Sequence, residues 1–176
     1  MMNLIEVNEQ NKAQAMALYE QSFPDNERKP WELMEACVKQ QTMKLYVMME
    51  EDEVIALAFI ILDDIYLLLD YLAIKANRQN QGIGSLILQW LKKEYPHLGL
   101  LVEIEDYQVY QEPMMLKRKA FYEQNGFQVM KDHIILFGVA MQLLATKPIS
   151  FDQYKKLLIK VFGNYCDQYI QLNSHL

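Results

Sequence analysis

The sequence has few cysteines, and this shortage limits the chemistry available to the protein. Its two cysteines, Cys37 and Cys166, lie far apart and form neither a Cys-x-x-Cys motif nor a ligand set with the three histidines. We therefore expect no zinc site and no other bound metal. Unpaired, reduced thiols are typical of a cytoplasmic protein, which is the location we expect.

Long apolar runs and an excess of basic charge are also missing. The longest apolar run, Val54 to Leu62, ends at two aspartates and is far shorter than the ~20 residues that a membrane span needs. The N-terminus, Met1-Met2-Asn3, is not followed by the basic and apolar regions of a signal peptide. The net charge is −6, and because phosphate binding needs a basic surface, nucleic acid is not an expected partner.

Length and apolar content indicate one domain, residues 1–176, with a core over about 3–146 and a helical extension over about 150–172. Segments 42–50, 54–62 and 65–74 read as strands joined by short acidic turns, which favours an antiparallel meander. A strongly amphipathic helix follows Gly84. Because this helix separates strand 65–74 from the next buried strand, 98–104, these two strands should be parallel neighbours.

The remaining pattern predicts two further helices and a final pair of strands. A helix that begins at Pro113 should end at Asn125-Gly126. The last strands are expected at 127–132 and 134–145, with His133 in the turn between them. Ser150 should cap a last helix with an aromatic stripe, formed by Phe151, Tyr154, Leu158, Phe162, Tyr165 and Tyr169. That stripe is expected to pack against the sheet or a second subunit, so a homodimer is possible.

The segment from Gln79 to Gly84 lies between a buried strand and a helix, and this position favours an anion site. The first turn of a helix has N–H groups without intrahelical partners and a positive dipole end, and glycine lets an anion come close. A Walker P-loop is excluded because no lysine follows Gly84, and a dinucleotide motif lacks its third glycine. An ordinary glycine turn stays open as the alternative.

Three motifs resemble the GNAT acetyltransferase superfamily. Gln79-x-x-Gly82-x-Gly84 resembles its pyrophosphate-binding motif, and the segment 118–127, which contains Phe121-Tyr122, resembles its later helix and turn. Residues 22–28 are similar to the start of bacterial members. The resemblance covers about 3–146. It implies an α+β fold with a mixed, mostly antiparallel sheet of six to seven strands, a parallel central pair, flanking helices and an extra C-terminal helix.

The resemblance also implies acetyl-CoA as cosubstrate and a direct transfer of the acetyl group to an amine. The N–H of Leu72 would stabilise the oxyanion, Ala73 and Ile74 would pair with the pantetheine arm, and Tyr122 would protonate the departing thiolate. For Tyr122, packing in the core is the alternative. The residues implied in coenzyme binding are Leu72, Ala73, Ile74, Gln79, Asn80, Gln81, Gly82, Ile83, Gly84, Ser85, Arg118, Phe121 and Tyr122.

Two carboxylates are candidates for binding the amine and taking its proton. Asp70 interrupts an apolar strand, where a carboxylate is unfavourable unless it is paired or its pKa rises. Glu103 lies on the neighbouring strand and, by alternation, shares a face with Glu105. If Asp70 and Glu103 face the substrate together, they can hold its ammonium. A strand end paired with lysine, or a water chain in place of a dedicated base, stays open.

The predicted function is therefore transfer of an acetyl group from acetyl-CoA to a small-molecule or protein amine within a ternary complex. The alternative is a non-catalytic acyl-CoA-binding or regulatory module with the same fold. An RNA-directed acetyltransferase is disfavoured by the acidic charge. The acceptor is not predicted, because fold does not fix function and the acceptor pocket is implied to lie among variable helices and loops.

Overall fold

The computed structural model describes residues 3–25 and 27–173, so the expectations for Met1, Met2, Asn26 and His175 fall outside the described residues. The chain forms two compact units, one of Met1–Ile61 with Leu69–Pro96 and one of Leu62–Leu68 with His97–Leu176. Strand β4 (Tyr66–Ile74) contributes to both. The strands are hydrogen-bonded in the order β1-β2-β3-β4-β5-β7-β6-β8.

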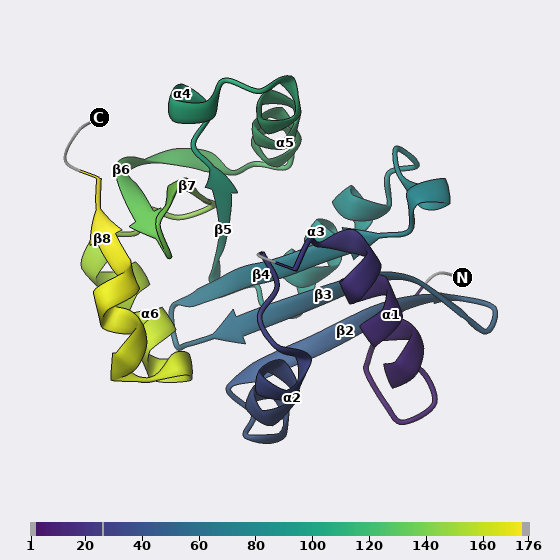
Figure 1. Cartoon of the computed structure of the whole chain (residues 1–176). Helices are drawn as coiled ribbons and strands as arrows, with labels where there is room; N and C mark the ends of the chain where they lie inside the picture. The colour runs from purple at the N-terminus through teal and green to yellow at the C-terminus, as the bar shows by residue number, and fades with distance from the viewer. Residues whose placement is uncertain (1–2, 26, 174–176) are drawn as a thin grey trace. The chain divides into compact units, whose positions relative to one another are not determined.

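The first unit begins with a strand and two helices and continues as a meander (Figure 1). Strand β1 pairs antiparallel with β2, and β2 pairs antiparallel with β3, as the short acidic turn predicted. A short 3-10 helix and α3 then follow β4. The bounds are β1 Asn3–Glu6, α1 Lys12–Ser22, α2 Trp31–Lys39, β2 Met43–Glu50, β3 Glu53–Leu62, the 3-10 helix Ala76–Arg78 and α3 Ile83–Glu94.

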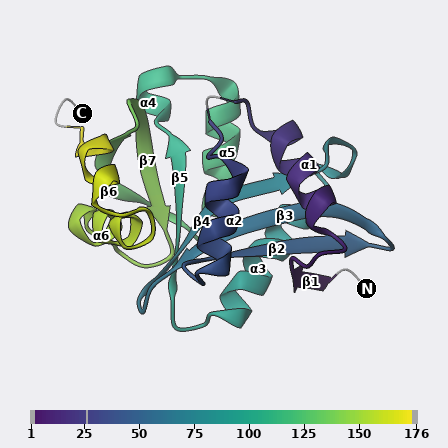
Figure 2. The ribbon, with the colours of Figure 1, turned by 60° about the horizontal axis from the view of Figure 1, so that its bottom comes forward.

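Helices cover both faces of β2 and β3 in this unit. Tyr46 pairs with Ala58 across the two strands, so Tyr46 and Phe59 point to opposite faces. Phe59 meets Tyr19 of α1 with ring centroids 5.6 Å apart, whereas Tyr46 meets Trp90 of α3 at 4.8 Å. Helices α1 and α2 therefore lie on one face and α3 on the other (Figure 2).

The second unit is built on the predicted parallel pair. Residues Tyr66–Leu68 of β4 pair in parallel with Gly99–Leu101 of β5, which confirms that prediction. Strand β7 pairs antiparallel with β5 and β6, and β8 pairs antiparallel with β6. The bounds are β5 Gly99–Glu105, α4 Tyr107–Tyr110, α5 Pro113–Gln124, β6 Gln128–Leu136, β7 Val139–Ala145, α6 Phe151–Phe162, a 3-10 helix Asn164–Tyr169 and β8 Ile170–Leu172.

Two expected features of this unit are wrong in detail. His133 lies inside β6, and the hairpin turns at Phe137-Gly138, where both residues have positive φ. Glycine supports that backbone conformation, and a two-residue turn of this kind matches the twist of the strands. The last helix ends at Phe162 before Gly163, which has φ +80, and β8 follows as an eighth strand.

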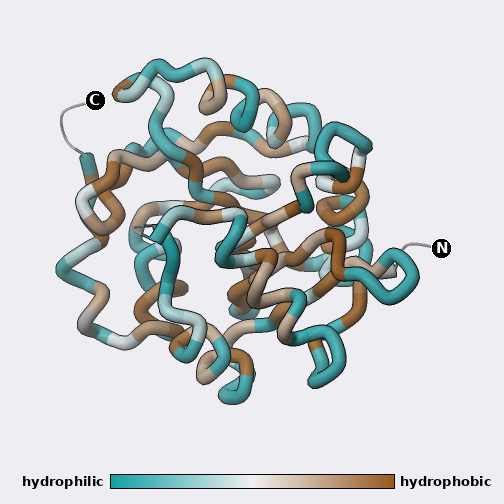
Figure 3. The backbone as a smooth tube through the Cα atoms, turned by 45° about the vertical axis from the view of Figure 1, so that its right-hand side comes forward, coloured by the Kyte–Doolittle hydropathy of each residue, from teal (hydrophilic) through white to brown (hydrophobic). Residues whose placement is uncertain are grey.

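Apolar residues concentrate in the strands, as the sequence predicted. Every residue from Val54 to Ile61 in β3 is buried. Figure 3 colours the backbone by hydropathy, with hydrophobic stretches in brown and hydrophilic stretches in teal. Within the described ranges, no helix is long and apolar enough to cross a membrane.

Candidate functional site

One edge of β4 offers main-chain groups to a ligand. The N–H of Lys75 donates to the Ile55 carbonyl of β3 over 2.9 Å. Because backbone polar groups alternate in direction along a strand, the N–H groups of Leu72 and Ile74 point toward the edge away from β3. Both residues are only half-buried, whereas Tyr71 and Ala73 are buried. This edge of the first unit can therefore bind an extended ligand through hydrogen bonds.

The turn after this strand has the geometry of an anion site. Gly82 has φ +80 and is the N-cap of α3, where no side chain caps the helix. The first intrahelical bond runs from the Leu86 N–H to the Gly82 carbonyl over 3.0 Å. The N–H groups of Ile83 and Gly84 belong to the first turn of α3, where backbone N–H groups have no carbonyl partner within the helix. A Cβ at Gly82 would meet nothing within 4 Å, so the approach is open.

The basic residues beside this turn are paired with carboxylates. Arg78 forms an ion pair with Glu50, and Lys75 forms one with Glu53 at 2.5 Å. Both carboxylates lie at the turn between β2 and β3. An anion at the start of α3 would therefore be bound mainly by backbone N–H groups and the helix dipole.

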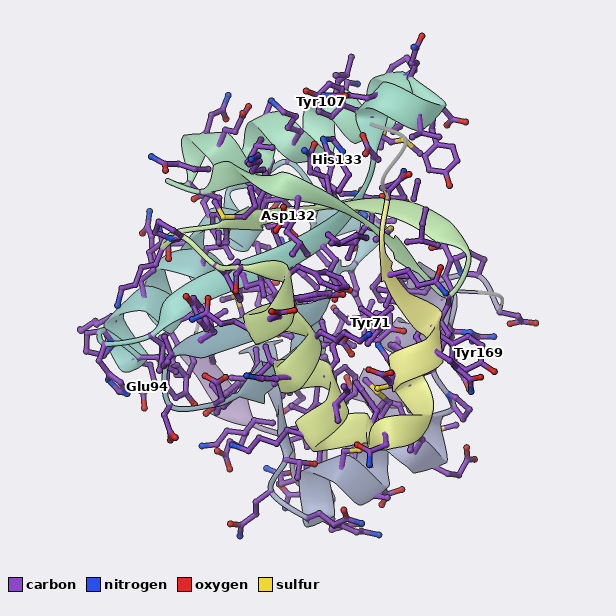
Figure 4. All side chains as sticks on the ribbon, turned by 90° about the vertical axis from the view of Figure 1, so that its left-hand side faces the viewer. Tyr71, Glu94, Tyr107, Asp132, His133 and Tyr169 are labelled. Atoms are coloured by element: carbon purple, nitrogen blue, oxygen red, sulfur yellow. The ribbon has the colours of Figure 1, made fainter. Side chains whose placement is uncertain are left out.

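Asp70 lies just before this edge and is held in an ion pair. Its side chain is 1% exposed, and both carboxylate oxygens accept from the Lys29 Nζ, at 2.7 and 2.9 Å. The same ammonium lies 4.8 Å from the centre of the Tyr71 ring, a residue labelled in Figure 4. The pairing satisfies the requirement that a buried carboxylate has a partner. A catalytic role for Asp70 stays a prediction.

The segment between α1 and α2 is tied to β4 beside this ion pair. The Lys29 N–H donates to the Tyr71 hydroxyl over 3.1 Å, and that hydroxyl donates to the Glu27 carbonyl over 2.9 Å. The Tyr19 hydroxyl donates to the Lys29 carbonyl over 3.0 Å. The backbone around Lys29 is thus fixed by bonds that do not involve its own side chain.

We expect Lys29→Met to lower the free energy of unfolding by about 1–3 kcal/mol, because it leaves the Asp70 carboxylate buried without this ammonium. Adding Asp70→Asn to that variant should recover part of the loss, because the buried charge is then removed. Urea unfolding of the two single variants and the double variant measures both effects. Strictly additive losses in the double variant would show that the two side chains do not interact.

In the second unit, Glu103 and Glu105 lie on one face of β5, as alternation predicted, and both are half-buried. Glu103 accepts a hydrogen bond of 2.6 Å from the Tyr154 hydroxyl. Glu105 forms an ion pair with Arg118 of α5. The Arg118 guanidinium therefore has a carboxylate partner here, and its contact with coenzyme phosphates stays a prediction.

Tyr122 lies in α5 and is 8% exposed. Its ring packs edge-on against Phe121 and Phe127, with centroids 5.0 and 5.3 Å away. Burial raises the pKa of the Tyr122 phenol to about 12, opposed by the nearby Arg118 charge. The phenol is therefore protonated at neutral pH, as a proton donor must be. The ring contacts with Phe121 and Phe127 are also those expected if Tyr122 only packs in the core.

Comparison with known proteins decides the family. Residues 41–129, just over half of the chain, match the family model of the acetyltransferase (GNAT) domain. The chain belongs to the GNAT acetyltransferase family. The match includes the turn at Gly82 and the 118–127 segment with Tyr122, which are two of the three motifs that carried the resemblance, and it leaves out residues 22–28. No curated protein sequence matches this GNAT chain at a significant level.

Solved structures of other GNAT proteins have a similar fold. A GNAT-family protein from Bacteroides thetaiotaomicron has a TM-score of 0.77 at 19% identity, covering 92% of this chain and 98% of that one. An Elizabethkingia anophelis GNAT acetyltransferase, with acetyl-CoA bound, has 0.62 at 16%, covering 83% and 97%. The ribosomal-protein-S18-alanine N-acetyltransferase of Escherichia coli has 0.63 at 14%, covering 85% and 96%. At these identities, the likeness shows a shared fold.

Sequence reasoning missed a buried polar cluster in the second unit of this GNAT chain. Asp106 is fully buried, accepts from the Gln108 N–H at 2.9 Å and lies 2.5 Å from the His133 Nδ1. The Gln142 amide nitrogen lies 3.5 Å from the other ring nitrogen. Figure 4 shows His133 on β6 next to Asp132. The available signal was Asp106, a residue of a type that favours the N-cap position, directly after β5.

The predicted site residues of this GNAT chain divide between its two units. The edge of β4, Asp70 and the glycine turn belong to the first unit, and Glu103, Arg118, Phe121 and Tyr122 belong to the second. That the carboxylates of Asp70 and Glu103 bind the same substrate amine stays a prediction. In the described part of the chain, His, Cys, Asp and Glu form no group of three that could hold a metal ion.

Proposed function

We propose that this GNAT-family protein transfers the acetyl group of acetyl-CoA to an amine. The observation that carries the proposal lies in the first unit, where the Leu72 and Ile74 N–H groups point away from β3 and α3 starts at a left-handed Gly82 without a side-chain cap. The strand edge suits the amide-containing pantetheine arm, and the helix start suits the pyrophosphate. The Elizabethkingia anophelis relative was solved with acetyl-CoA bound, which supports the same cosubstrate here.

The proposed reaction is a direct attack of the amine on the thioester carbonyl carbon. A carbon–nitrogen bond forms, the carbon–sulfur bond breaks, and the sulfur leaves as a thiolate. The N–H of Leu72 stabilises the negative oxygen that develops on the carbonyl. Tyr122 supplies the proton to the thiolate, and Glu103 or Asp70 receives the proton that the amine loses, directly or through water.

The acceptor is proposed to be a small-molecule or protein amine. The Escherichia coli relative is named for acetylation of an alanine of a ribosomal protein, and another relative is an aminoglycoside 6'-N-acetyltransferase complexed with coenzyme A. Both acceptor classes are therefore included in the test below. The Glu103 carboxylate suits an acceptor that arrives as an ammonium ion, whereas both oxygens of Asp70 already accept from the Lys29 ammonium.

The test is to incubate the protein with acetyl-CoA and a panel of small amines and peptides with free N-terminal or lysine amines, and to measure the free thiol released. We expect acetyl-CoA to raise the melting temperature and at least one amine to release thiol. Binding without release for any amine would favour the non-catalytic acyl-CoA-binding module. If acetyl-CoA neither binds nor stabilises the fold, the proposed coenzyme site is wrong.

A further inference from the structure

Helix α6 brings a tyrosine to one of the two candidate carboxylates. This helix lies after residue 129, where the match to the family model ends. Tyr154 in its first turns is fully buried, and its hydroxyl donates to the Glu103 Oε1 over 2.6 Å. Both residues belong to the second unit. The contact therefore joins the C-terminal extension to β5 at the residue proposed to take part in proton transfer.

The start of α6 is fixed, so the position of Tyr154 is fixed too. Ser150 and Gln153 form a capping box, in which each side chain bonds the backbone N–H of the other. The Phe151 N–H donates to the Asp132 carboxylate of β6 over 3.3 Å. Asp132 is labelled on that strand in Figure 4. These contacts hold the first turn of the helix against the sheet of the second unit.

The bond between Tyr154 and Glu103 has the length of a charge-assisted hydrogen bond. Bonds from a hydroxyl to a carboxylate are shorter and stronger than those between neutral groups. Such a bond favours the ionised carboxylate and restricts its side-chain torsions, because the ring of Tyr154 cannot move within the core. Glu103 as a whole residue is half-buried, and this bond holds one oxygen of its carboxylate against α6.

We propose that Tyr154 is a positioning residue for acetyl transfer, which holds the Glu103 carboxylate in the orientation and charge state that accept the proton of the amine. The inference rests on the proposed function. It assigns a role to the C-terminal extension, since α6 then contributes to the transfer step. The competing explanation is that the carboxylate only satisfies a buried hydroxyl, in which case Glu103 takes no part in the rate.

The chain offers a matched control for removing the Tyr154 hydroxyl. Tyr66 is also buried in the second unit, and its hydroxyl donates over the same 2.6 Å, but to the main-chain carbonyl of Pro148. Tyr154→Phe and Tyr66→Phe each delete one buried hydroxyl and keep the ring. A general loss of stability should therefore affect both variants, whereas loss of a donor to Glu103 affects only the first.

The first measurement is a titration of Glu103, observed by NMR of protein with 13C-labelled glutamate carboxyl groups, with Glu103→Gln to assign the signal. Tyr154→Phe should move the Glu103 transition to higher pH, because the ionised form loses a hydrogen-bond donor. Tyr66→Phe should leave it in place. An unmoved transition in Tyr154→Phe, or an equal shift in both variants, overturns the proposal.

The second measurement is the rate of transfer to the amine identified by the panel. Tyr154→Phe should lower kcat about tenfold and move the acidic limb of the pH–rate profile to higher pH, with the Kd for acetyl-CoA unchanged. A shifted titration with an unchanged rate rejects the positioning role. If the unmutated protein does not bind acetyl-CoA, the proposed function fails, and the NMR titration still decides whether Tyr154 controls Glu103.

Discussion

Replacing Gly82 by valine should weaken acetyl-CoA binding on the order of 100-fold, or about 2.7 kcal/mol. The space beside its α-carbon is open in the structure, and Gly82 has φ +80. A branched side chain would occupy the approach to the N–H groups of Ile83 and Gly84. It would also push the backbone out of the left-handed region, which moves those N–H groups away from the anion. Isothermal titration calorimetry with acetyl-CoA measures the loss.

Gly138 provides the control for this substitution. It has φ +83, with nothing within 4 Å of a built Cβ, but it lies in the turn between β6 and β7. Gly138→Val should lower the melting temperature about as much as Gly82→Val and leave acetyl-CoA binding unchanged. If both variants bind acetyl-CoA like the unmutated protein, the start of α3 is not the coenzyme site.

Replacing Tyr122 by phenylalanine should lower kcat by about 100-fold or more, because a positioned general acid contributes about 10²–10⁴-fold. The Kd for acetyl-CoA should change little, since the ring and its contacts with Phe121 and Phe127 are kept. Steady-state thiol release and equilibrium binding of acetyl-CoA separate these two effects. An unchanged kcat would assign Tyr122 to core packing alone.

The raised pKa of Tyr122 gives this prediction a pH dependence. Burial favours the neutral phenol and raises its pKa to about 12, so the proton is present throughout the neutral range and is lost only as the pH rises through that value. We therefore expect no loss of rate from this group between about pH 7 and 10. A basic limb in that range that disappears in Tyr122→Phe would contradict the shifted pKa.

Local patterns predicted most of the secondary structure because they depend on short stretches of chain. The spacing of Ala15, Leu18 and Tyr19 predicted the buried side of α1, and all three are buried. The turn at Asn125-Gly126 ends α5 as expected, with φ +82 at the glycine. The parallel pairing of β4 with β5 followed from a general rule for strands separated by a helix.

Contacts between residues distant in sequence could not be predicted in the same way. The Lys29–Asp70 ion pair spans 41 positions, and the Tyr154–Glu103 bond spans 51. Both depend on how separate elements pack, which a periodic pattern does not encode. His133 was expected in a turn, and its place inside β6 could not be recognised because its partner Asp106 lies 27 positions away in the sequence. For the same reason, Asp70 was identified as unusual while its lysine was not.

The pairing of Arg78 with Glu50 and of Lys75 with Glu53 has a consequence for how coenzyme affinity responds to the solution. Salt weakens binding most where an anion is held by exposed, mobile cations. Here the flanking cations are already neutralised, and backbone N–H groups neither titrate nor exchange counterions. Affinity for acetyl-CoA should therefore stay nearly constant as ionic strength rises and as the pH varies around neutrality, and simple polyanions should be poor competitors.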